Sequence, residues 1–97
     1  MSPRKAFRRA AAVVARDRGV PLQAILIPRG GRRQVQRARQ VALYLAVTGL
    51  DVCRSHAAQA VGISHQYGMR VVSKIEDLRE DPEFDIWIAS LEERLVA

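Results

Sequence analysis

The sequence predicts an all-α fold of six helices, two of them short. Apolar residues recur at helical spacing in several segments, whereas no strand-like alternation of apolar and polar residues extends over five residues. Glycine and proline interrupt the helical pattern at intervals. A chain of 97 residues is long enough for one hydrophobic core, so we expect a single domain over residues 1–97.

The N-terminal part predicts two helices and a basic loop. Residues 4–18 carry one apolar stripe, formed by Phe7, Ala10, Ala11 and Val14. Gly19 stands where a helix commonly ends in the left-handed conformation. A short helix is expected over residues 21–26, with a proline in its first turn. Pro28 and two glycines end that helix, and the basic loop is expected over residues 28–37.

The rest of the chain predicts four further helices, over residues 34–47, 52–61, 65–79 and 83–96. Asp51 is expected to cap the first turn of the helix that follows it. The helix over 65–79 is expected to bury five apolar side chains: Met69, Val71, Val72, Ile75 and Leu78. The last helix carries a stripe of its own, formed by Phe84, Trp87, Ile88, Leu91 and Leu95.

The charge of the chain is concentrated in its N-terminal part. Residues 1–40 hold eleven basic residues and one acid, for +10, and residues 41–97 hold five basic residues and nine acids, for −4. Fourteen of the sixteen cations are arginine, which pairs well with phosphates and with guanine edges. This concentration favours a polyanionic partner, and nucleic acid before any other.

Several classes of function are not supported by the residues present. A single cysteine, Cys53, excludes an internal disulfide and a cysteine-based zinc site. His56 and His65 have no further ligand at metal spacing, and the two glycines at 30–31 do not belong to a phosphate-binding G-x-x-x-x-G-K-[ST] loop. No apolar run is long enough to span a membrane. We therefore expect a cytoplasmic protein with no enzyme activity, cofactor, metal, nucleotide or membrane partner.

The segment from Ala57 to Ile75 has the layout of a helix-turn-helix, which we expect over residues 52–79. Gly62 stands in the turn, where a left-handed backbone suits glycine, and Ser64 is placed to cap the second helix. The exposed start of that helix would present side chains that can reach base edges in a major groove. An ordinary helical hairpin with a glycine turn has the same layout, and the adjacent basic block favours the DNA-binding interpretation.

The run ARQVALYL, from Ala38 to Leu45, resembles the helix that opens the DNA-contacting part of domain IV of the bacterial replication initiator DnaA, a domain with a TrpR-like helix-turn-helix. Upstream, VARDRGVPLQAILIPRGGRRQVQ is similar to the first helices and the arginine-rich loop of that family. Downstream, GISHQYGMRVVSKIEDLRE is similar to its signature segment, with His65 at the position of the signature histidine. The resemblance covers about residues 10–96 and implies a helical DnaA domain IV-like bundle with a helix-turn-helix.

The resemblance, together with the charge, gives a set of expected DNA contacts. Five arginines are expected to hold phosphates, with Arg32 or Arg33 entering the minor groove: Arg29, Arg32, Arg33, Arg37 and Arg39. Five residues are expected to read bases: Ser64, His65, Gln66, Tyr67 and Arg70. The family signature reads Gly-Arg-Asp-His-Thr-Thr-Val, whereas this chain has Gly62 to Gly68 as GISHQYG, with a turn one residue shorter. We therefore expect a target sequence other than the DnaA box, and Gly68 is expected to leave room beside the DNA.

The sequence thus predicts a sequence-specific double-stranded DNA-binding protein that acts as a transcription regulator in the nucleoid. Stand-alone proteins of this kind resemble regulators that include activators of phage-like gene clusters. One alternative is a modulator of replication that competes with DnaA at an origin. Another is an adaptor that binds a protein, such as the transcription machinery, through the acidic C-terminal helices around Trp87. The acidic segment 76–85 is expected to stay off the DNA.

Overall fold

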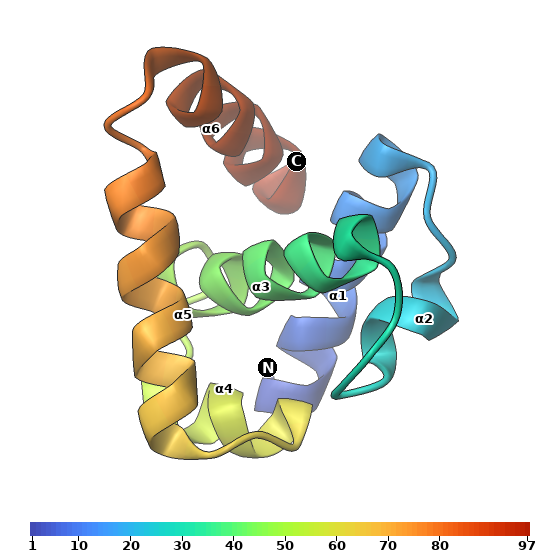
Figure 1. The fold of residues 1–97 in the computed structure, drawn as a ribbon. Helices are drawn as coiled ribbons and strands as arrows, with labels where there is room; N and C mark the ends of the chain where they lie inside the picture. Colours follow the sequence, from blue (N-terminus) through green and yellow to red (C-terminus); the bar gives the residue numbers. More distant parts are fainter.

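The computed structural model describes all 97 residues, which form six helices and no strand (Figure 1). The helices are α1 (Pro3–Arg18), α2 (Leu22–Leu26), α3 (Arg33–Thr48), α4 (Arg54–Val61), α5 (His65–Leu78) and α6 (Pro82–Val96). The all-α prediction with two short helices, α2 and α4, is confirmed. None of the six is both long and apolar enough to cross a membrane.

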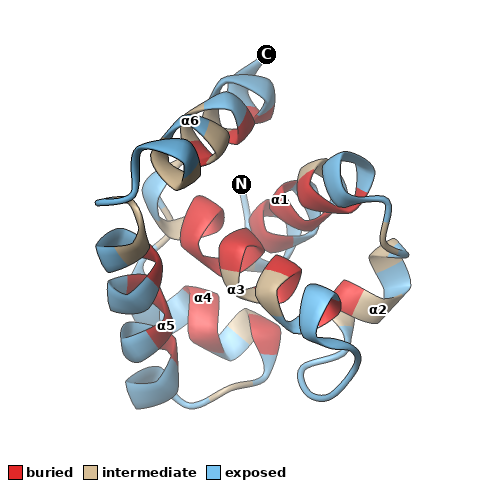
Figure 2. Cartoon of the chain, turned by 45° about the horizontal axis from the view of Figure 1, so that its top comes forward, coloured by how far each residue is buried: buried red, intermediate tan, exposed pale blue.

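Helix α3 is the centre of the molecule and packs chiefly against α1 and α5 (Figure 1). Helix α4 packs against α5 and the N-terminal part of α1, while α6 covers the opposite end of the globule (Figures 1 and 2). The result is a compact body of 30 × 26 × 24 Å. Every residue from Val41 to Ala46 is buried, which fits a helix that other helices surround.

The core is built mainly from aliphatic and alanine side chains, as the low aromatic content requires. Small residues on α1, such as Ala10 and Ala11, let its backbone approach α3 closely. Tyr44 is the largest side chain that is fully buried, and its hydroxyl donates to a Glu76 carboxylate oxygen at 2.6 Å. This bond links α3 to the C-terminal end of α5.

Helix α6 is held by an arginine at the end of α5. Arg79 donates to Asp85 and Glu92 on α6 and to the hydroxyl of Tyr44 on α3. Three helices therefore meet at one guanidinium. Burial alone lowers the pKa of Arg79, but its bonds to Asp85, Tyr44 and Glu92 outweigh this effect and raise the pKa above the ordinary value for arginine.

Local chemistry explains where several helices begin and end. The hydroxyl of Ser2 accepts from the amide of Lys5 at the start of α1, and Gly19 ends that helix with φ +67°. Asp51 does not cap α4, which was a wrong prediction: the helix starts two residues later than expected, and Asp51 takes φ +59° in the preceding turn. Met69 was also expected in the core, but its side chain is 41% exposed.

Candidate nucleic-acid interface

Helices α4 and α5 are joined by a tight three-residue turn, 62–64. Gly62 has φ +88°, and its amide donates to the carbonyl of Ala58 at 3.0 Å, as does the amide of Ile63 at 3.1 Å. The hydroxyl of Ser64 accepts from the amide of Tyr67 at 3.1 Å, so Ser64 caps α5 as the sequence predicted. The turn therefore fixes the start of α5 relative to α4.

Close packing of the two helices depends on Gly68. A Cβ atom at this position would lie 2.9 Å from the Cβ of Ala58, closer than such atoms normally approach. Gly68 is buried against α4, so the expectation that it leaves room beside a ligand was wrong. Its role is to bring α4 and α5 together, which helps to hold the exposed first turn of α5 in place.

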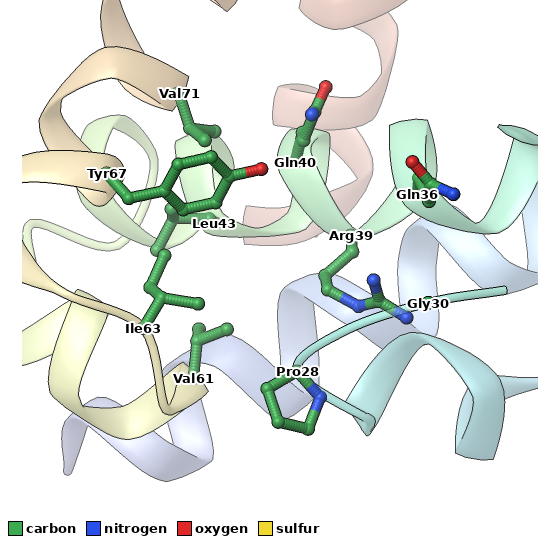
Figure 3. A pocket seen from close by; sticks show the side chains of 10 residues that line it. All are labelled: Pro28, Gly30, Gln36, Arg39, Gln40, Leu43, Val61, Ile63, Tyr67 and Val71. Carbon is green, nitrogen blue, oxygen red and sulfur yellow. The ribbon is translucent and has the colours of Figure 1, made fainter.

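The first turns of α5 present mostly exposed polar side chains. Ser64, His65, Gln66 and Arg70 are all exposed, and none of their side chains forms an ion pair. Tyr67 is 41% exposed, and its ring lies along a hollow with the hydroxyl pointing toward Gln40 (Figure 3). The structure thus brings the five residues predicted to read bases to one end of α5, with Tyr67 turned toward α3.

The hollow beside Tyr67 has a volume of about 100 Å³ and lies between α5, α3 and the loop before α3 (Figure 3). Its floor is apolar, with Leu43, Ile63 and Val71 among its lining residues, whereas Gln36 and Gln40 line it with amides. Both glutamines were missed in the sequence. Their spacing of four residues places them on one face of a helix, and this was the available signal.

The loop between α2 and α3 packs against the turn of the α4–α5 pair. Pro28 lies 3.5 Å from the position that a Cβ on Gly62 would occupy. The Nε2 of Gln36 donates to the carbonyl of Gly31 at 2.8 Å, which ties the loop to α3. Arg29 and Arg32 on this loop are exposed and have no acidic partner, so their charges are available next to the start of α5.

The predicted basic loop, residues 28–37, is shorter than expected because α3 already begins at Arg33. Arg39 was expected to hold a phosphate, and the structure corrects this expectation. Its side chain is 8% exposed, and its Nε and Nη2 donate to the carbonyls of Ile25 and Ala24 at 3.1 and 3.0 Å. Arg39 therefore satisfies carbonyls at the end of α2 and secures the loop from inside.

Arg33 and Arg37 share one partly exposed stripe of α3 with Gln36 and Gln40, but they border it on the other side. They line a separate pocket together with side chains of α1 and α6. The five arginines predicted to form one phosphate-binding set are therefore divided. Arg29 and Arg32 lie on the loop beside α5, and Arg39 is buried. Arg33 and Arg37 line the pocket shared with α1 and α6.

Three further cations lie beside α4. Arg4, Lys5 and Arg8 on α1 line a surface hollow whose other side includes Ala60 on α4. Arg4 also borders a second hollow with His56 and Gln59. These three cations are not among the residues predicted to hold phosphates. The signal was there, since residues 1–16 contain no acid and exposed cations recur at helical spacing in this stretch.

The acidic segment 76–85 lies at the far end of α5. A helix of 14 residues is about 20 Å long, which separates this segment from Ser64. Asp85 pairs with Arg79, and Glu76 accepts a hydrogen bond from Tyr44, which Arg79 also contacts. The side chains of Glu80, Asp81 and Glu83 are exposed and form no ion pair. Part of the acidity therefore stabilises the fold.

The structure shows no group of three or more His, Cys, Asp or Glu side chains able to hold a metal ion.

Cys53 is exposed just before α4. Its hydrogen bond with the Ser55 hydroxyl, followed by the backbone amides of Ser55 and His56, lowers the pKa of the thiol. Cys53 is thus a surface residue.

Comparison of the chain with protein-family models, with curated proteins and with solved structures gives no significant match. The functional interpretation therefore depends on the residues and on their arrangement.

Proposed function

We propose that the protein binds double-stranded DNA in a sequence-specific way through a helix-turn-helix formed by α4 and α5. The observation that carries the proposal is the arrangement around the start of α5. A rigid turn presents exposed polar side chains, and unpaired cations lie next to the same turn on the loop and beside α4 on α1. In a helix-turn-helix complex the second helix enters the major groove and the first crosses the backbone.

The proposed roles follow from this arrangement. His65, Gln66 and Arg70 contact base edges, and Gln66 can bond adenine through two hydrogen bonds. Arg29 and Arg32 hold phosphates or enter the adjacent minor groove, because their loop packs against the turn at Gly62. Ser64 and Tyr67 contribute at the edge of this surface, where the Tyr67 ring borders the hollow in Figure 3.

We further propose a transcription regulator, as the resemblance to DnaA domain IV implies, with the helical bundle of that domain and a place of action in the nucleoid. Activation of phage-like genes is one form of this role, and competition with DnaA at an origin is the alternative. The role proposed is a binding role without enzyme chemistry. Binding of the transcription machinery at Trp87 is less favoured, because its indole Nε1 donates to Asp17 at 2.7 Å and Arg18 covers its ring.

The test is selection of binding sites from a random duplex library, followed by competition with a DnaA-box duplex and with scrambled DNA. The proposal expects one discrete motif that outcompetes both, since each changed base contact costs about 1–3 kcal/mol. The variant Gln66→Ala should relax specificity at one or two positions of that motif. Absence of any enriched motif would contradict the proposal, and equal competition by the DnaA box would favour the replication modulator.

A further inference from the structure

The pocket that contains Arg33 and Arg37 is lined by cations and aromatic rings. Arg18 approaches from the end of α1, Arg33 and Arg37 from the first turns of α3, and Phe84 and Trp87 from α6. Its volume is about 420 Å³, within the range of sites for small organic molecules. It shares no lining residue with the hollow beside Tyr67.

The aromatic side of the pocket is well ordered by contacts. The rings of Phe84 and Trp87 meet edge to face with centroids 5.5 Å apart. The guanidinium carbon of Arg18 lies 3.8 Å from the centroid of the Trp87 ring. Asp17 accepts from the Trp87 indole and from Arg94 at 2.7 Å each, whereas its nearest contact with Arg18 is 3.8 Å. Asp17 therefore orients the indole, and it shares its charge between Arg94 and the more distant Arg18.

The cationic side carries charge that the fold itself does not need. Arg33 and Arg37 form no ion pair, and their spacing of four residues makes them repel each other. They also lie at the N-terminal end of α3, where the helix dipole disfavours cations and where no acid occurs in the first turn. No side chain caps this end. A bound anion would relieve all of these unfavourable interactions at once.

We propose that this pocket binds a small organic phosphate of nucleotide size. Arg18, Arg33 and Arg37 pair with the phosphate oxygens, which suit the guanidinium fork. The planar part of the ligand lies along the ring of Phe84, because Arg18 already covers the ring of Trp87. Such recognition by arginines and aromatic rings needs no glycine-rich phosphate loop, and it is independent of the DNA-binding proposal.

Trp87 is the single tryptophan of the chain, so its fluorescence reports on this pocket directly. We would titrate the full chain with ADP, inorganic pyrophosphate and adenosine in the absence of DNA. The expected result is a saturable change with ADP, a weaker one with pyrophosphate, and none with adenosine at the same concentrations. The double variant that combines Arg33→Ala with Arg37→Ala should raise the Kd for ADP at least tenfold.

The charge-matched control is the pair Arg29→Ala and Arg32→Ala, which should leave the Kd for ADP within twofold. No saturable response to ADP and pyrophosphate at millimolar concentration would overturn the proposal. So would equal weakening in the two double variants, which would show a general charge effect. Loss of duplex binding in the Arg33 and Arg37 variant, without ADP binding by the wild type, would show that the pocket holds DNA phosphates instead.

Discussion

The two arginines that pair with acids around α6, Arg79 and Arg94, differ in use from the two on the loop beside the α4–α5 turn, Arg29 and Arg32. Arg79 and Arg94 are held by carboxylates, with Arg79 bonded to Asp85 and Glu92. Arg29 and Arg32 have no acidic partner, although they carry the same side chain. The difference indicates that the first group stabilises the fold and that the second is available to a ligand.

The same contrast separates effects on stability from effects on binding. An arginine that is enclosed by acceptors leaves several groups without a partner when it is removed. An exposed, unpaired arginine contributes little to the free energy of unfolding, and its removal changes affinity for an anion. Variants of the first group should therefore lower the free energy of unfolding, whereas variants of the second group should lower affinity for an anion.

The largest expected effect is that of Arg79→Ala. Because the change leaves Asp85, Glu92 and the hydroxyl of Tyr44 without their common donor, the free energy of unfolding should fall by about 2–4 kcal/mol. Urea denaturation followed by circular dichroism measures this quantity. Arg54→Ala, at an exposed arginine without an ion pair, is the control and should change it by less than about 0.5 kcal/mol.

Arg39→Ala should have the next largest effect, a loss of about 2 kcal/mol, because the carbonyls of Ala24 and Ile25 lose their donor. Arg37→Ala on the same helix is the matched control and should be close to neutral for stability. Equal unfolding midpoints for the two variants would show that the buried hydrogen bonds of Arg39 contribute nothing measurable.

Arg39 also illustrates what could be predicted from the sequence. Its spacing from Val35 and Ala42 places it on the inner face of α3, yet its residue type suggested a phosphate contact. The periodicity was the better guide. Gly68 is a similar case, since it falls in register with Val71, Val72 and Ile75, the buried face of α5.

Other features followed directly from local chemistry. The six helices, the left-handed Gly62 and the Ser64 cap depend on residues close in the sequence, so they could be predicted. The division of the arginines over three environments could not. It depends on which neighbours α3 acquires on each side, and this is decided by contacts between helices that are distant in the chain.

A third variant tests the cations of α1. Arg4→Ala combined with Arg8→Ala should weaken duplex binding about fivefold. The slope of log K against log salt concentration should also become shallower by about 1.8, if each arginine neutralises one phosphate. Fluorescence anisotropy over a range of salt concentrations measures both values. An unchanged affinity and slope would remove α1 from the interface while leaving the α5 proposal intact.

The smallest effect concerns pH. Burial raises the pKa of Asp17, but hydrogen bonds from Trp87 and Arg94 outweigh this and hold it below its ordinary value. The ionised carboxylate therefore stabilises the fold above the unfolded pKa of about 3.9, and this contribution is lost as pH falls through the lower, folded pKa. Asp17→Asn should be less stable than wild type at pH 7, and thermal melts should converge below about pH 4. A difference in melting temperature between wild type and Asp17→Asn that stays constant over this pH range would contradict the stabilising role of the Asp17 carboxylate.

The central claim is that the unpaired cations beside the α4–α5 turn bind DNA phosphates. The most direct test is the slope of log K against log salt for a duplex selected from random DNA. It should be measured for the wild type and for the pair Arg29→Ala and Arg32→Ala. With about four phosphates neutralised, we expect a wild-type slope of about −3 to −4, flattened by about 1.8 in the variant. Absence of duplex binding, or a slope that the variant leaves unchanged, would contradict the claim.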